Sequence, residues 1–252
     1  MIFFLVKKLP KYLTILLVFI SIVLLCFILA GSFDTSPSFS NVYVLEFKFN
    51  SSSEYYPIIQ KSYSLQNSSS TLSNMKIRVG YLGMCVLLNG SLTCSSNGNL
   101  GTLSSYSGVS LSNSTNPDSQ LNLVNLASTF ANICHPYILM ATIILSIILF
   151  FLVFWASFPL PGKVLVQKCN CIISITNVLL WGLGSMLQQE ATTAVKKIVG
   201  PASMHTIIAT VGTRCMAMTW TVFTFNLIVS MGTVFVFVRG LKQAAQIIEP
   251  KF

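Results

Sequence analysis

The sequence predicts an all-α membrane protein, in which a four-helix transmembrane bundle carries a small antiparallel β-sheet outside the membrane. Hydrophobic residues make up 53% of the 252 residues and charged residues only 8%, whereas a soluble domain usually has about 25% charged residues. Four long apolar stretches also follow one another along the chain, each near the ~20 residues that a helix needs to cross a bilayer. An ordinary cytosolic enzyme, a disordered chain and a nucleic-acid-binding protein are therefore excluded.

The four predicted spans differ in polarity. The third is diluted by polar residues such as Ser174, Asn177 and Ser185, and the fourth contains Asn226 but no charge. Small and polar residues allow helices to approach closely and to form hydrogen bonds across a bundle. We therefore expect the third span to be the most buried helix; the alternative is a three-span protein with a surface helix there. The spans cover residues 12–30, 137–158, 171–187 and 216–238.

Basic residues near the span ends predict the orientation. The short segments 1–11, 159–170 and 239–252 hold eight of the fifteen Lys and Arg residues, and cytosolic segments carry such an excess. Both termini are therefore expected in the cytosol, and the loops 31–136 and 188–215 outside. The net charge of +9 then reflects topology, with a contribution from attraction to anionic lipid.

A cleaved signal peptide is the alternative for the first span. Its 19 residues without a charge exceed the usual signal core of ~7–15, which favours an uncleaved anchor.

Four Asn-X-Ser/Thr sequons lie in the first loop. One such motif is weak evidence because it occurs by chance, but all four lie on the side that the charge pattern makes external. They predict a glycosylated ectodomain. The acceptors are Asn50, Asn67, Asn89 and Asn113.

The rest of the first loop divides into polar runs and alternating segments. Residues 62–74 and 95–120 are rich in Ser and Asn, which is typical of a flexible linker. Residues 43–50 and 76–81 alternate apolar and polar side chains, which predicts half-buried strands of a small sheet.

Residues 85–94 (CVLLNGSLTC) predict a disulfide-stapled hairpin. Asn89-Gly90 is a preferred pair for a two-residue turn, because both residues need positive φ. A turn centred there places Cys85 opposite Cys94 as a non-hydrogen-bonded pair, with Cα atoms ~4.5 Å apart, which a disulfide can span. Because the extracellular side is oxidising, we expect a Cys85–Cys94 disulfide.

The other cysteines give weaker signals. Cys26 is expected to be an inert buried hydrophobe. Cys169 and Cys171 lie at the predicted cytosolic edge of the third span, a common setting for palmitoylation; free reduced thiols fit equally well. Cys134 and Cys215 both lie at external span ends, where a second disulfide is the less favoured alternative.

A local motif in the first loop resembles a family signature: Gly, two bulky apolar or aromatic residues, Gly, any residue, Cys, and then a second Cys. The motif residues are Gly80, Tyr81, Leu82, Gly83, Cys85 and Cys94. Together with the four-span pattern, this resembles the fungal family of pheromone-induced calcium regulators and membrane fusion proteins, which is related to the claudin superfamily.

The resemblance implies a claudin-like, left-handed four-helix bundle with a small sheet from the outer loops. It also implies a role at the plasma membrane of mating cells, where family members support low-affinity calcium entry and membrane fusion. Claudins carry Trp in the first loop, whereas Trp155, Trp181 and Trp220 of this chain all lie in spans. Paracellular sealing is therefore not implied.

The sequence offers little material for catalysis. Its histidines, His135 and His205, lie near external span ends with no Cys, His or acidic cluster at metal-ligand spacing. We expect no enzyme activity, metal or cofactor. The expected partners are membrane lipids, a second copy of the chain, and a calcium-channel or fusion partner, with no nucleic acid.

Two other roles compete with regulation. A self-sufficient calcium pore is less favoured, because no predicted span contains a charged residue and cation pores present acidic rings; a Glu190 ring from several copies would supply one. An adhesion module would use Tyr81 and Leu82 as exposed contacts, although we favour their packing within the protein.

Overall fold

The computed structural model describes residues 2–66, 74–96, 108–110, 120–133, 136–157 and 163–248. The chain forms two compact units, each assembled from separated segments. A helical unit comprises residues 1–26, 137–186 and 218–252, and a β unit comprises residues 27–136 and 187–217. The first segment of the β unit joins the first two long helices, and the second joins the last two.

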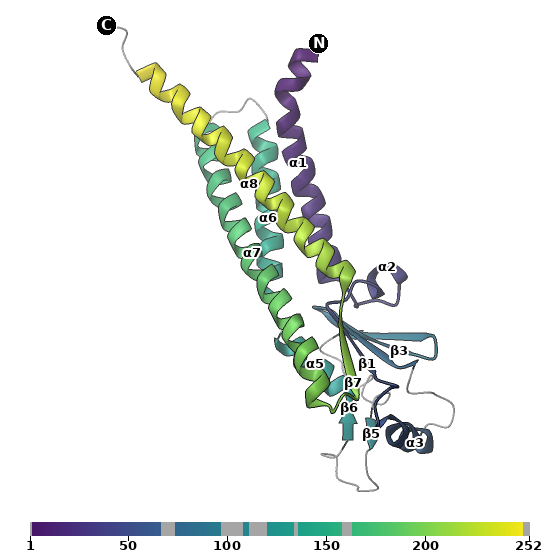
Figure 1. The fold of residues 1–252 in the computed structure, drawn as a ribbon. Coiled ribbons are helices and arrows are strands. Elements are labelled where there is room, and N and C mark those ends of the chain that lie inside the picture. The colour runs from purple at the N-terminus through teal and green to yellow at the C-terminus, as the bar shows by residue number, and fades with distance from the viewer. Residues whose placement is uncertain are drawn as a thin grey trace. The chain divides into compact units, whose positions relative to one another are not determined.

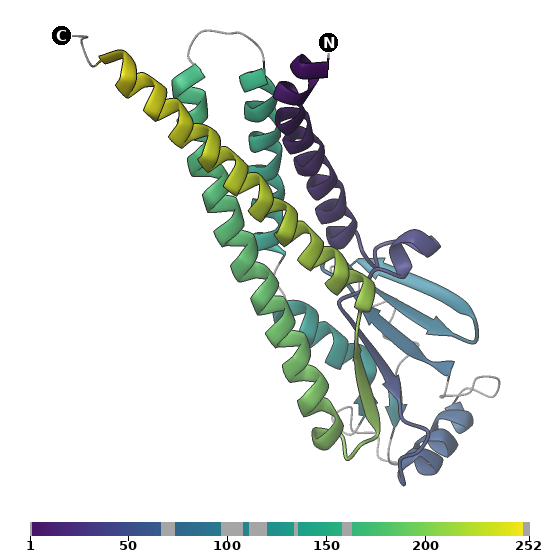
Figure 2. The same ribbon diagram turned by 45° about the horizontal axis from the view of Figure 1, so that its top comes forward.

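Four helices in the described residues are long and apolar enough to cross a membrane, which confirms the predicted number. They are α1 (Ile2–Leu29), α6 (Tyr137–Ser157), α7 (Lys163–Ala202) and α8 (Thr213–Ile248). Within the helical unit they run side by side, and the start of α1 lies at the same end as the end of α8 (Figures 1 and 2). An even number of crossings requires this arrangement.

The apolar spans of α7 and α8 are longer than predicted, whereas the span of α1 differs by one residue at each end. They cover Lys11–Leu29, Leu165–Ala202 and Thr213–Leu241. Hydropathy finds the part of a helix that suits hydrocarbon, but a helix continues wherever backbone hydrogen bonding and packing allow it. The segment 188–202 is polar, yet it has no helix-breaking residue before Gly200 and Pro201, so α7 runs on into the β unit.

The face of α7 that packs inside the helical unit carries polar side chains. Asn177 Nδ2 donates to Ser146 Oγ at 3.0 Å, Trp181 Nε1 donates to the Thr219 carbonyl at 3.2 Å, and Ser174 Oγ lies 2.7 Å from Thr233 Oγ1. The buried share of the span in α7 is 39%, the largest of the four. The prediction that polar residues make the third span the most buried helix is therefore confirmed.

The β unit contains a five-stranded antiparallel sheet in the order β4-β3-β2-β1-β7. The strands are β1 (Leu45–Phe49), β2 (Lys76–Val79), β3 (Gly83–Leu88), β4 (Ser91–Ser96) and β7 (Ile207–Val211). The first four come from the first loop, whereas β7 comes from the second and pairs with β1 from Leu45↔Val211 to Phe49↔Ile207. Both loops therefore build one sheet.

Short elements accompany the sheet in the β unit. They are helices α2 (Pro37–Ser40), α3 (Tyr56–Gln66) and α5 (Leu123–Ile133), and the paired strands β5 (Gly108–Ser110) and β6 (Gln120–Asn122). Phe130 of α5 contacts fully buried Phe47 edge to face at 6.4 Å between ring centroids. Helix α3 begins before the Ser-rich run and includes its first residues, so that part of the predicted linker is ordered.

The predicted fold class is confirmed: the described chain is mostly helical, with four candidate spans and a small antiparallel sheet. The likeness to claudins and the left-handed sense of the bundle stay predictions.

A disulfide-stapled hairpin as the candidate functional site

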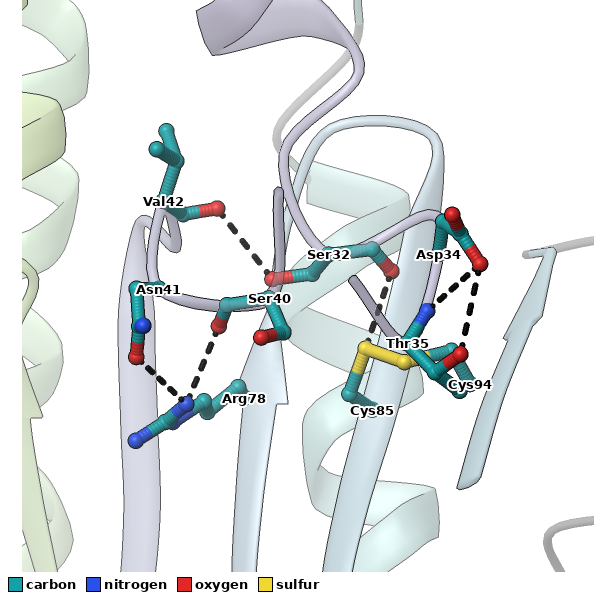
Figure 3. Close-up of a disulfide and its surroundings, with 9 residues drawn as sticks. All are labelled: Ser32, Asp34, Thr35, Ser40, Asn41, Val42, Arg78, Cys85 and Cys94. Atoms are coloured by element: carbon teal, nitrogen blue, oxygen red, sulfur yellow. Dashed lines mark hydrogen bonds between the residues drawn. A yellow bond between two sulfur atoms is a disulfide. The ribbon is translucent and has the colours of Figure 1, made fainter. Parts of the chain in front are cut away.

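Strands β3 and β4 form the hairpin with the predicted register. Cys85 faces Cys94, and Leu88 faces Ser91 across the turn. Both turn residues have positive φ, 48° at Asn89 and 84° at Gly90, as the two-residue turn requires. The Cα atoms of Cys85 and Cys94 lie 4.0 Å apart, and their sulfurs are joined in a disulfide (Figure 3).

The disulfide lies against the segment that follows α1. The Cys85 side chain is fully buried, and its Sγ lies 3.3 Å from the Ser32 carbonyl oxygen (Figure 3). Because a disulfide sulfur carries no hydrogen, this approach is a sulfur–oxygen contact rather than a hydrogen bond. Ser32 is itself held by Val42, whose carbonyl accepts from Ser32 Oγ at 3.3 Å. The staple therefore joins the hairpin to the chain leaving the first span.

The two motif glycines are needed because backbone approaches them closely. A Cβ on Gly80 would overlap the Gly31 carbonyl oxygen, and one on Gly83 would lie 2.7 Å from the Ser32 carbonyl oxygen. A Cβ on Gly31 would in turn overlap the Val42 carbonyl oxygen. The neighbours are backbone atoms, which cannot rotate away as a side chain would. Glycine at both motif positions thus allows the 31–33 backbone to lie directly on the sheet.

The bulky motif residues lie between and beside the glycines. Tyr81 is only 8% exposed, and its hydroxyl donates to Gln188 Oε1 at 2.9 Å. Gln188 Nε2 in turn donates to Cys215 Sγ at 3.4 Å. Tyr81 therefore links the first loop to the second. Its interpretation as an exposed adhesion contact is wrong, and the favoured interpretation, that Tyr81 packs within the protein, is confirmed. Leu82 is half-buried.

A largely buried ion pair on the sheet was not predicted. Arg78 Nε donates to Glu46 Oε2 at 3.0 Å, and the two side chains are 17% and 9% exposed. Arg78 Nη1 also donates to the Ser40 carbonyl at 3.1 Å and to Asn41 Oδ1 at 3.2 Å (Figure 3). Glu46 is one of the polar positions in the alternating segment 43–50, and it is buried and paired with Arg78. The signal in the sequence was one acid, in a strand that also holds Lys48, and one arginine, in a strand that also holds Lys76.

Tyr43 shares this environment. The Arg78 guanidinium carbon lies 5.0 Å from the centre of the Tyr43 ring, a distance at which a cation is attracted to the ring face. Burial and then the Glu46 carboxylate raise the pKa of Tyr43 above its ordinary value of 10.0, while Arg78 and Arg214 oppose that rise.

The predicted glycan acceptors differ in accessibility. Asn89 is exposed at the hairpin tip. Asn50 is half-buried, and its Nδ2, the atom that a glycan would modify, donates to the His205 carbonyl at 2.8 Å. Asn67 and Asn113 lie outside the described residues. Asn89 is therefore the more accessible of the two described acceptors.

The remaining predicted cysteine sites also differ. Cys171 is buried and Cys169 half-exposed, so Cys169 is the more accessible to an acyltransferase. Cys134 lies outside the described residues, so a second disulfide between Cys134 and Cys215 stays an untested, less favoured alternative. Cys26 is exposed on α1, and its expected burial is wrong because it lies on the outer face of that helix.

Acidic side chains do not gather in the part of the chain that the structure describes. No group of three or more His, Cys, Asp or Glu residues there is arranged to hold a metal ion. Glu190, the candidate for a pore ring, is exposed on α7. The hairpin is held by its disulfide and by close backbone contacts at the motif glycines, and the neighbouring strands β1 and β2 share the Arg78–Glu46 ion pair.

These features define a multi-pass membrane protein whose first loop contributes a disulfide-stapled hairpin to a small antiparallel sheet. Residues 62–239, which include the whole motif, match the family described as Ca2+ regulator and membrane fusion protein Fig1. The chain is also similar to the Factor-induced gene 1 protein of Saccharomyces cerevisiae (strain ATCC 204508 / S288c), with 33% identity over 265 residues, covering 96% of this chain and 88% of that protein. The chain belongs to the Fig1 family.

Proposed function

We propose that this protein regulates low-affinity calcium influx and membrane fusion at the plasma membrane of mating fungal cells. Family membership supports the role, because the family is described as a Ca2+ regulator and membrane fusion protein. The observation that carries the proposal is the fixed hairpin: residues 80–94 are held by a disulfide, two backbone-contacting glycines and the Tyr81–Gln188 hydrogen bond. A surface held in one conformation binds a partner with little loss of conformational entropy.

The proposal includes an orientation. Both termini lie in the cytosol and the β unit lies outside, which agrees with the excess of Lys and Arg in the terminal segments. The same placement exposes Asn89 to the glycosylation machinery and the cysteine pair to an oxidising compartment.

Replacement of the staple tests the function. Cys85→Ser removes the bridge to Cys94, and we expect both cell fusion and pheromone-stimulated calcium uptake to fall. Cys26→Ser makes the same chemical change on the exposed face of α1 and is the matched control. Both variants are compared in cells that lack the native gene, with equal amounts of each variant at the cell surface. Normal fusion and calcium uptake with Cys85→Ser would contradict the proposal.

A pore is the second candidate function, favoured only by the exposed position of Glu190. Because the described interior of the helical unit offers neutral Ser, Thr and Asn side chains, regulation of a separate channel is the better proposal. Liposomes containing the purified protein alone separate the two. No calcium flux is expected for a regulator, whereas flux that Glu190→Gln abolishes would establish the pore.

A further inference from the structure

One end of the helical unit is strongly basic. By sequence, this unit holds eight Lys and Arg residues and a single acid, Glu249. In the sequence, the basic residues fall near the start of α1, the start of α7 or the end of α8. These three helix ends lie at the same end of the helical unit (Figure 2). The excess of positive charge at this end favours anionic groups from outside the protein, such as those of anionic lipid.

A cavity of about 80 Å³ lies at the same end, bounded by all four helices. One water needs ~10–15 Å³ by this measure, so the cavity has room for a larger group. Its polar lining includes Lys11 and Thr14 of α1 and Gln167 and Asn170 of α7, and its apolar lining includes Val153 and Val236. Cationic and apolar groups thus lie within one site.

Two features make this cavity a built site rather than a gap between helices. Asn170 is 6% exposed, and its Oδ1 is buried with no hydrogen-bond partner, an arrangement that costs free energy unless a donor arrives. Gly232 is exposed and lines the cavity, and a Cβ there would meet nothing within 4 Å. The cavity is therefore open to the outer surface of the bundle at a position where a side chain would close it.

We propose that this cavity binds the headgroup of an anionic phospholipid. Lys11 pairs with the phosphate, and Asn170 Oδ1 accepts a hydrogen bond from a hydroxyl or ammonium group of the headgroup. The acyl chains lie along the exposed apolar surface that begins at Val236, which is 44% exposed. Basic pockets between transmembrane helices bind anionic headgroups in this way. The site does not depend on the calcium or fusion role.

The test measures lipid retained by the purified full chain. Protein is incubated with phosphatidylcholine vesicles with or without phosphatidylserine or phosphatidylinositol, then extracted, and bound lipid is counted by native mass spectrometry. We expect retention of the anionic lipids over phosphatidylcholine. Inorganic phosphate and water-soluble glycerophosphoserine are added in parallel, and neither should displace the lipid, because they lack acyl chains.

Three variants complete the test. Gly232→Leu places a side chain at the opening and favours helix more than glycine does, so α8 is kept; we expect retention to fall about tenfold. Lys11→Gln should cause a similar fall, the size expected for loss of a charge-assisted hydrogen bond. Met231→Leu, 66% exposed and outside the cavity, is the control and should match the native chain.

Equal retention by Gly232→Leu and Met231→Leu would overturn the proposal, as would equal retention of phosphatidylcholine and the anionic lipids. If inorganic phosphate displaced the bound lipid, the cavity would be a phosphate site, and the proposal that it binds a lipid headgroup would be overturned.

Discussion

Gly83→Ala is the most informative change to the sheet. The added Cβ would lie 2.7 Å from the Ser32 carbonyl oxygen and 3.0 Å from that of Ser95. Ordinary contact begins near 3.4 Å, so the Ser32 backbone must move by 3.4 − 2.7 = 0.7 Å. Overpacking of this kind costs about 1–3 kcal/mol. We expect the upper end, about 3 kcal/mol, because both neighbours are backbone and one of them also contacts the disulfide.

Thermal unfolding of the full chain in detergent measures this cost. About 3 kcal/mol corresponds to a fall in midpoint of roughly 6–12 °C. Gly90→Ala is the control: its φ of 84° is unfavourable for alanine, but no atom lies within 4 Å of the new Cβ, so we expect about 1 kcal/mol. A fall for Gly83→Ala no larger than for Gly90→Ala would refute the close-approach explanation of the motif.

Three further changes test other contacts of the β unit by the same measurement. Arg78→Met leaves the Glu46 carboxylate largely buried without its partner and should cost about 3 kcal/mol; an unchanged midpoint would show that the pair contributes nothing. Tyr81→Phe removes the hydrogen bond to Gln188 and should cost about 1–3 kcal/mol, and no loss would mean that water replaces the hydroxyl. Because the pKa of Tyr43 is raised in the folded protein, its contribution to stability is present below pH 10.0 and is lost as pH rises through the folded pKa. Tyr43→Phe should reduce the fall in stability above pH 10.0, and an identical alkaline fall in both proteins would contradict the shift.

The hairpin could be predicted from sequence because its determinants are local. Asn89-Gly90 fixes the turn, and the turn fixes the register that places Cys85 opposite Cys94. The spans could likewise be predicted, because apolar length decides which segments suit hydrocarbon.

What could not be predicted depends on residues far apart in the chain. The need for glycine at Gly80 and Gly83 arises from the backbone at 31–33, about fifty residues earlier. The pairing of β7 with β1 joins segments separated by more than 150 residues. Alternation marks Glu46 only as a polar position, because the sequence of one strand cannot show that Arg78 on the next strand pairs with it. A span prediction also stops where polarity begins, whereas α7 continues to Ala202.

Thiol labelling on intact mating cells tests the proposed arrangement most directly, in which an oxidised hairpin lies outside the membrane. Cells are treated with a membrane-impermeant maleimide before and after an impermeant reductant, and labelling of Cys85 and Cys94 is read by mass spectrometry. We expect no label before reduction. After reduction we expect label on Cys94, which is half-exposed, whereas Cys85 is fully buried. Labelling without reductant would show free thiols, and labelling only after permeabilisation would place the hairpin inside the cell; either result would contradict the account.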